Sequence, residues 1–139
     1  MSSHRNDTYQ QLLRARHFMR EHYASSLDLD QIARQASFSR YHFLRLFRET
    51  FHQTPHQYLV QRRIECAKTL LATGDLSITE VCFEVGFQSL GSFSTLFHRC
   101  TGYPPKAYRA RVFQGIDLER RFVPTCFFRG WQTAALISR

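Results

Sequence analysis

Long hydrophobic runs are missing from this 139-residue sequence. No stretch approaches the roughly 20 apolar residues that a membrane-spanning helix needs. The first seven residues, MSSHRND, also lack the apolar core that is typical of a signal peptide. Together these absences predict a soluble, cytoplasmic protein with no membrane partner.

Motifs for metal binding and catalysis are also scarce. The four cysteines include no C-x-x-C pair, and there is no G-x-S-x-G motif or glycine-rich phosphate loop. His52 and His56 have the spacing of a metal pair, but Pro55 starts a helix between them and no acidic residue accompanies them. We expect no catalytic residues, no metal and no cofactor. One enzyme alternative remains, a thiol or metal enzyme that would need an accessible, perturbed thiol among Cys66, Cys82, Cys100 and Cys126. Otherwise these should be free, partly buried thiols.

Lysine is nearly absent, although the chain is strongly basic. Lys68 and Lys106 are the only lysines among 19 Lys+Arg residues, which face 11 Asp+Glu and give a net charge of +8. The planar guanidinium of arginine suits phosphates and guanine edges better than an ammonium does. The charge therefore favours a nucleic-acid partner.

Only 6 Gly and 4 Pro interrupt a chain that is otherwise rich in helix signals. Apolar residues at spacings of three and four predict a first helix over 8–23. Capping residues and helix-start prolines mark six more. Two of these six helices open at Asp28 and Ser77. The other four run over 40–50, over 55–73, over 90–100, and from 104–105 to 111. Hydrophobic residues at 43% suffice for a packed core, and the length allows one domain or two very small ones.

The sequence contains an internal repeat. Residues 28–38 align with 77–87 at a shift of 49, and residues 43–58 align with 93–108 at a shift of 50. The matched residues of the first copy are Asp28, Ile32, Ala33, Ser37, Phe38, Phe43, Phe47, Pro55 and Tyr58. In the same order, those of the second copy are Ser77, Val81, Cys82, Gly86, Phe87, Phe93, Phe97, Pro105 and Tyr108. The second copy therefore has one extra residue, either in its turn or at the start of its second helix. Two copies of one helical unit are predicted.

Each copy has the residues that a helix-turn-helix needs. A short capped helix is followed by a small residue, Ser37 or Gly86, and by an aromatic residue. The small residue permits a sharp bend, and we expect Gly86 to have a positive φ. The phenylalanines of the second helix then point inward. This second helix, which we call the reading helix, is placed to enter a major groove of DNA.

Residues 78–109, ITEVCFEVGFQSLGSFSTLFHRCTGYPPKAYR, resemble the signature of the AraC/XylS family of bacterial transcription regulators. The family runs I-A-x-x-V-G-F, F-S-x-x-F and G-x-x-P-x-x-Y-R are matched nearly throughout. The segment DLDQIARQASFSRYHFLRLFRE similarly resembles the family's first helix-turn-helix, and the resemblance covers about residues 8–111. It implies a sequence-specific DNA-binding transcription regulator that inserts two reading helices, about 40–50 and 90–100, into successive major grooves. Cys82 departs from the alanine that is common in the family.

The expected fold is therefore all-α, with two helix-turn-helix subdomains joined by a long linker helix and followed by a short C-terminal extension. The predicted parts are a first subdomain at 8–54, the linker helix at 55–73, a second subdomain at 74–111 and the extension at 112–139. At 1.5 Å per residue the linker would be roughly 28 Å long, which is close to the roughly 34 Å between adjacent turns of a major groove. The extension either packs on the second subdomain or serves as an oligomer arm.

The resemblance assigns base reading in the first subdomain to Tyr41, Leu44 and Arg45. Helical periodicity agrees, because these residues share the face opposite the inward-pointing phenylalanines. The corresponding candidates in the second subdomain are short, so they should read fewer bases; they are Gly91, Ser92 and Thr95. Contacts to the DNA backbone are predicted for Ser39, Arg40, Arg48, Arg62, Arg63, Ser89, Arg99 and Lys106.

Other interpretations of these residues stay open at this point. Arg40, Arg45 and Arg48 also fit an ordinary solvated helix face. Tyr41 also fits packing at the helix start, and Leu44 either contacts a thymine methyl or is simply exposed. The functional alternative is a protein-interaction module that contacts an acidic partner such as RNA polymerase.

The expected main partner is double-stranded DNA, bound by a monomer at an asymmetric site. RNA polymerase is a further expected partner. The sequence shows no obvious site for a small-molecule effector, and no effector-binding or dimerisation domain is expected before the DNA-binding part.

Overall fold

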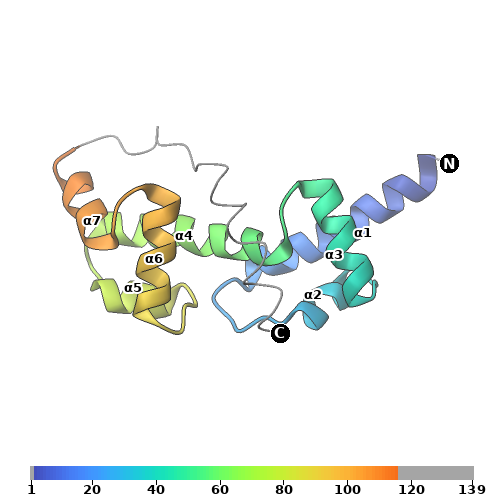
Figure 1. Cartoon of the computed structure of the whole chain (residues 1–139), viewed down its shortest axis with the longest axis horizontal. Coiled ribbons are helices and arrows are strands. Elements are labelled where there is room, and N and C mark those ends of the chain that lie inside the picture. Colours follow the sequence, from blue (N-terminus) through green and yellow to red (C-terminus); the bar gives the residue numbers. More distant parts are fainter. Residues whose placement is uncertain (1, 116–139) are drawn as a thin grey trace. The chain divides into compact units, whose positions relative to one another are not determined.

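The computed structural model describes residues 2–115, and within them the chain forms seven helices and no strand (Figure 1). The helices are α1 (Ser2–Glu21), α2 (Leu29–Gln35), α3 (Arg40–Phe51), α4 (Pro55–Thr73), α5 (Ile78–Glu84), α6 (Leu90–Thr101) and α7 (Pro105–Phe113). The predicted all-α fold is confirmed. In this described part, every helix is either too short or too polar to cross a membrane.

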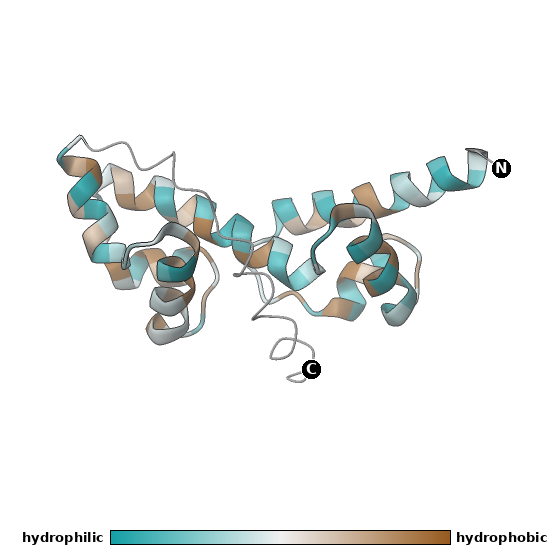
Figure 2. Ribbon diagram, turned by 45° about the horizontal axis from the view of Figure 1, so that its top comes forward, coloured by the Kyte–Doolittle hydropathy of each residue, from teal (hydrophilic) through white to brown (hydrophobic). Residues whose placement is uncertain are grey.

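The chain divides into two compact units, and the boundary between them falls between Val60 and Gln61, inside α4. In the first unit α1, α2 and α3 pack on one another. In the second unit α6 packs on α5 and α7. Figure 2 shows hydrophobic and hydrophilic residues alternating along the helices, as expected for helices that bury one face.

Reciprocal capping boxes start the first helix of each helix-turn-helix, as the sequence predicts. The Gln31 amide donates to Asp28 Oδ1 at 2.7 Å, and the Asp28 amide donates to Gln31 Oε1 at 3.1 Å. The Glu80 amide donates to Ser77 Oγ at 3.1 Å, and the Ser77 amide donates to Glu80 Oε2 at 2.9 Å. Each box satisfies two backbone donors that the first turn leaves without helical partners.

The turns of the two units share a backbone conformation. Ser37 has φ 59° and Gly86, at the matching position, has φ 101°, so the positive φ expected for Gly86 is confirmed. The turn between α2 and α3 spans residues 36–39, whereas the turn between α5 and α6 spans 85–89. The extra residue of the second copy therefore lies in its turn and not in its reading helix.

The cores are built from the same aromatic residues. Phe43 and Phe47 of α3 are fully buried, with ring centroids 5.5 Å apart, and Phe93 and Phe97 of α6 repeat this arrangement at 5.6 Å. A tyrosine from the following helix packs against the second phenylalanine of each pair, Tyr58 at 6.1 Å and Tyr108 at 5.2 Å. The inward orientation predicted for the four phenylalanines is confirmed.

The structure differs from the sequence prediction mainly at helix ends. Helix α1 begins at Ser2, not at Thr8, because residues 3–7 are exposed and carry no apolar stripe that periodicity could detect. The same helix ends at Glu21, two residues before the predicted end at 23. Helix α7 continues to Phe113, past the predicted end at 111. Both predictions for the C-terminal extension concern mostly residues 116–139, which lie outside the described part of the chain.

Thr54 and Gln57 form a third capping box ahead of α4. The sequence prediction had placed this helix start at Thr54-Pro55 but had not included the box. The Thr54 amide donates to Gln57 Oε1 at 2.8 Å, and the Gln57 amide donates to Thr54 Oγ1 at 3.1 Å. The spacing T-x-x-Q in the sequence was a sufficient signal for this box.

Candidate nucleic-acid interface

The reading helix of the first unit, α3, carries on one face the three residues that were predicted to read bases. Tyr41 is 81% exposed, Arg45 is exposed and Leu44 is half-buried. Because Phe43 and Phe47 occupy the opposite side of the same helix, this face points away from the core. The exposure of Tyr41 argues against the alternative that it packs at the helix start.

The arginines of α3 fall into two groups. Arg45 and Arg48 are exposed, and within residues 2–115 neither forms an ion pair. Arg40 instead binds Asp30 of α2 through two parallel bonds, with Nε 3.0 Å from Oδ1 and Nη2 2.7 Å from Oδ2. This hydrogen-bonded carboxylate raises the pKa of the Arg40 guanidinium. Two arginines of this helix are thus available to an external anion, and the third is held by an internal one.

The reading helix of the second unit, α6, presents a different surface. Gly91, Ser92 and Thr95 are exposed, as predicted, and outside its chain neighbours and the adjoining helix backbone no atom lies within 4 Å of the position that a Cβ on Gly91 would take. Leu90 is 41% exposed. This helix offers close approach to its backbone and few long polar side chains.

Both reading helices begin with a serine cap that was predicted to contact the DNA backbone. Ser39 Oγ accepts the His42 amide at 3.4 Å, and Ser89 Oγ accepts the Ser92 amide at 3.2 Å. Both serines are exposed. Since each hydroxyl acts as an acceptor in its cap, its own proton can be donated to a phosphate oxygen.

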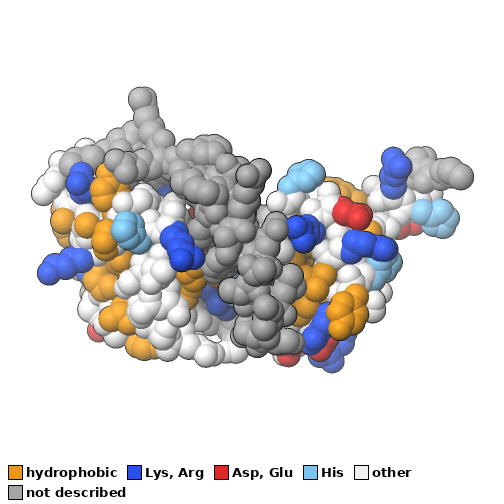
Figure 3. All heavy atoms as spheres, in the orientation of Figure 1, with side chains coloured by type: hydrophobic (Ala, Val, Ile, Leu, Met, Phe, Trp, Pro, Cys, Tyr) orange, Lys and Arg blue, Asp and Glu red, His pale blue; other side chains and the backbone are white. Residues whose placement is uncertain are grey.

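The remaining cations predicted for phosphates lie in the second unit. Arg99 and Lys106 are exposed. Arg62 and Arg63 of α4 are half-buried: Arg62 Nη1 lies 3.9 Å from Glu65 Oε2, and the Arg63 guanidinium lies 5.9 Å from the centre of the Phe87 ring. On the face drawn in Figure 3, Lys and Arg side chains lie at the surface of both units, with exposed hydrophobic side chains among them.

Two of the three described cysteines, Cys82 and Cys100, are poor candidates for reactive thiols. Cys66, Cys82 and Cys100 are free, as predicted, and the last two are buried. Burial raises the pKa of Cys82, and it raises the pKa of Cys100 to about 12, although Lys68 opposes that shift. A reactive thiol needs the opposite shift. Cys126 lies outside the described residues, and within them no three metal-binding side chains converge.

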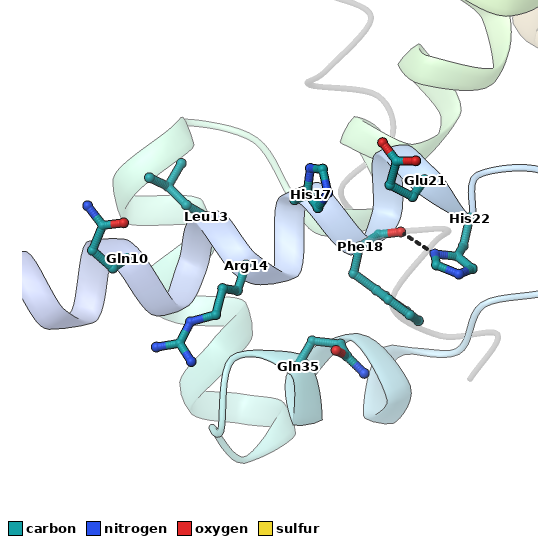
Figure 4. A pocket seen from close by; sticks show the side chains of 8 residues that line it. All are labelled: Gln10, Leu13, Arg14, His17, Phe18, Glu21, His22 and Gln35. Carbon is teal, nitrogen blue, oxygen red and sulfur yellow. Dashed lines mark hydrogen bonds between the residues drawn. The ribbon is translucent and has the colours of Figure 1, made fainter.

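A shallow groove of about 480 Å³ lies along α1 in the first unit. Figure 4 shows Arg14 and Phe18 extending from α1 toward Gln35 of α2. His22 Nδ1 lies 3.0 Å from the Phe18 carbonyl oxygen. The rest of the groove is lined by Gln10, Leu13, His17 and Glu21.

Sequence comparison identifies the class of protein. A family profile described as a helix-turn-helix domain matches residues 32–111. The regulatory protein SoxS of Escherichia coli K12 is 33% identical over 92 residues, which cover 66% of this chain and 86% of SoxS. The MmsAB operon regulatory protein of Pseudomonas aeruginosa is 37% identical over 98 residues, which cover 70% of this chain but 32% of that protein.

Solved structures give the same result. The DNA-binding domain of AdpA, in complex with a target DNA, matches with a TM-score of 0.69 and 34% identity, covering 75% of this chain and 96% of that domain. An AraC-type regulator from Chromobacterium violaceum matches with a TM-score of 0.70 and 27% identity, covering 76% and 95%. The chain therefore belongs to the AraC/XylS family of helix-turn-helix transcription regulators.

Asp30 is the residue of this surface that sequence reasoning missed. Its side chain pairs with Arg40, ten positions along the chain and in the next helix. A carboxylate in the first turn of a helix has an ordinary explanation, since it interacts favourably with the helix dipole. Only the relative orientation of α2 and α3 reveals the pair.

Proposed function

We propose that this chain regulates transcription by sequence-specific binding to double-stranded DNA, with α3 as its principal reading helix. The observation that carries the proposal is the exposed face of Tyr41, Leu44 and Arg45 opposite two fully buried phenylalanines. Such a face offers an aromatic ring, an aliphatic group and a guanidinium together. These groups suit the base edges and thymine methyl groups of a major groove.

In this proposal Arg45 supplies most of the discrimination. Its guanidinium can donate two hydrogen bonds to O6 and N7 of one guanine. Leu44 contacts a thymine methyl, and Tyr41 packs against the bases next to it. Because Arg45 forms no ion pair within the described residues, binding a base breaks no existing ion pair.

The second reading helix, α6, contributes position more than sequence. Gly91, Ser92 and Thr95 let the helix approach the groove closely, but their side chains reach few base edges. The two reading helices enter successive major grooves of one DNA face. The presence of two matched copies joined by α4, a 19-residue helix, supports this arrangement.

Phosphate contacts fix the register of both helices on the duplex. Hydroxyl donors come from the two cap serines, and charge comes from arginines and one lysine. The proposed set is Ser39, Arg48, Arg62, Arg63, Ser89, Arg99 and Lys106.

We propose that one monomer occupies an asymmetric site, since a single chain carries both reading helices. Analytical ultracentrifugation with a fluorescent duplex tests this by giving the mass of the complex; two chains per duplex would contradict it. RNA polymerase is the further proposed partner, and we propose the groove along α1 for it, because no residue of α3 lines that groove.

Salt dependence separates DNA recognition from general attraction to acidic surfaces. The test is fluorescence anisotropy with a duplex selected from a random pool and with a scrambled duplex of equal length. The logarithm of the binding constant should fall linearly with the logarithm of salt concentration, because bound phosphates release counterions. The scrambled duplex should compete at least about a hundredfold more weakly. Equal competition by both duplexes would contradict the proposed function.

A further inference from the structure

The ion pair between Asp30 and Arg40 links the two helices of the first helix-turn-helix. Asp30 lies in the first turn of α2, and Arg40 is the first residue of α3, directly before Tyr41. The two parallel bonds, at 3.0 and 2.7 Å, use the planar edge of the guanidinium. A fork of this kind constrains orientation as well as distance, because both donors must meet both oxygens in one plane.

The position of Arg40 gives the carboxylate a second role. The N-terminus of a helix carries partial positive charge and disfavours a cation there. Asp30 neutralises the cation that the sequence places at this point. It also puts a negative charge beside Arg40, where a DNA phosphate would have to bind.

The second unit has no counterpart of this pair. The positions that match Asp30 and Arg40 are Thr79 and Leu90, which cannot form an ion pair. The ion pair is therefore found in the unit whose reading helix presents Tyr41 and Arg45. Precise orientation matters most there, because bidentate base contacts tolerate little displacement.

We infer that Asp30 and Arg40 form a positioning pair that orients α3 for base recognition, and that Arg40 does not contact DNA phosphate. This inference rests on the proposed function. Arg40 was predicted from the sequence to contact the DNA backbone, and here it instead makes a contact within the protein. Asp30 becomes a determinant of specificity although it touches no base.

The test compares Asp30→Asn, Arg40→Gln and the double variant on selected and scrambled duplexes. Each single variant should lower the ratio of the two binding constants by roughly tenfold, and the double variant should lower it no further, since both changes break one interaction. The ratio is independent of the fraction of folded protein, so a loss of stability alone cannot mimic this result. Circular dichroism melting checks that the substitutions, at the exposed Asp30 and the half-buried Arg40, leave the fold intact.

Arg34→Gln is the matched control for the loss of one positive charge. Arg34 lies on the same helix as Asp30, and its Nε donates to the Asp30 carbonyl oxygen at 3.3 Å, so its loss leaves the Asp30 carboxylate in place. The control should keep the wild-type ratio. The salt slope of Arg40→Gln should equal that of the wild type, whereas loss of a phosphate contact would make it shallower by roughly one unit.

Three results would overturn the inference. A shallower slope for Arg40→Gln, together with tighter binding of both duplexes by Asp30→Asn, would make Arg40 a phosphate contact that Asp30 restrains. Unchanged ratios in both single variants would remove any role in positioning. If the wild-type chain itself fails to distinguish the two duplexes, the proposed function fails and the inference fails with it.

Discussion

In both units the reading helix buries two phenylalanines completely, Phe43 and Phe47 in the first and Phe93 and Phe97 in the second. The faces opposite these rings carry different residues. Where α3 has Tyr41 and Arg45, α6 has Gly91 and Thr95 at the matching positions. The comparison teaches that the core specifies the helix-turn-helix, while the residues of the exposed face are free to differ.

The backbones of the two units also adopt the same conformation with different residues. The turn before each reading helix has a positive φ at Ser37 and Gly86, and the residue after each reading helix has one at His52 and Gly102. The first unit uses residues with a side chain at both points, and the second uses glycine. Since positive φ costs an L-residue about 1 kcal/mol or more, the first unit carries backbone strain that the second avoids.

Truncation of the equivalent buried phenylalanines should give the largest effects and show whether the cores are equal. Phe47→Ala and Phe97→Ala each remove a side chain that is 0% exposed, and each should cost about 3–5 kcal/mol of unfolding free energy. Urea denaturation followed by circular dichroism measures both. A cost near zero at one site and several kcal/mol at the other would show that the two cores are not equivalent.

Substitution at the turn should separate the two units. Gly86→Val places a β-branched residue at φ 101°, which should destabilise the second unit by about 1–3 kcal/mol. Ser37→Gly is the matched control, and it should be neutral or slightly stabilising, because glycine adopts φ 59° without steric cost. Thermal melting checks both variants. If Gly86→Val melts like the wild type, the turn tolerates a side chain, and the helix-turn-helix register proposed for the second unit is wrong.

Alanine at the matching positions of the two reading helices should have unequal effects on binding. Arg45→Ala should weaken binding to the selected duplex by about 1–3 kcal/mol and relax preference at one base pair, because two hydrogen bonds to a guanine are lost. Thr95→Ala should change binding by less than about 0.5 kcal/mol. Anisotropy titrations on single-base-pair variants measure both. If Arg45→Ala weakens selected and scrambled duplexes equally, Arg45 binds phosphate and reads no base.

The smallest expected effect distinguishes the two exposed arginines of α3. Arg48→Ala should weaken binding to selected and scrambled duplexes alike and make the salt slope shallower by roughly one unit, because it removes one phosphate contact. Salt titrations of both duplexes give the slope. An altered base preference in this variant would assign Arg48 to a base instead.

Much of this architecture was accessible from the sequence because its signals are local. Capping boxes, helix-start prolines and the spacing of phenylalanines act within a few residues, and the repeat allowed each copy to support the other. The start of α1 was missed because residues 3–7 carry no apolar stripe. Ser37 and His52 gave no sign of positive φ, since neither is glycine. The contact from Asp30 to Arg40 depends on how two helices cross, which local patterns do not encode.

Selection of bound sites from a random duplex pool tests most directly the claim that the two reading helices differ. Sequencing of the selected pool should show one strongly specified segment of a few base pairs, read by Tyr41, Leu44 and Arg45. About one helical turn away it should show a second, weakly specified segment whose preference follows DNA shape. A motif with two equally sharp halves would contradict the account, and it would mean that α6 reads bases through side chains other than those of Gly91, Ser92 and Thr95.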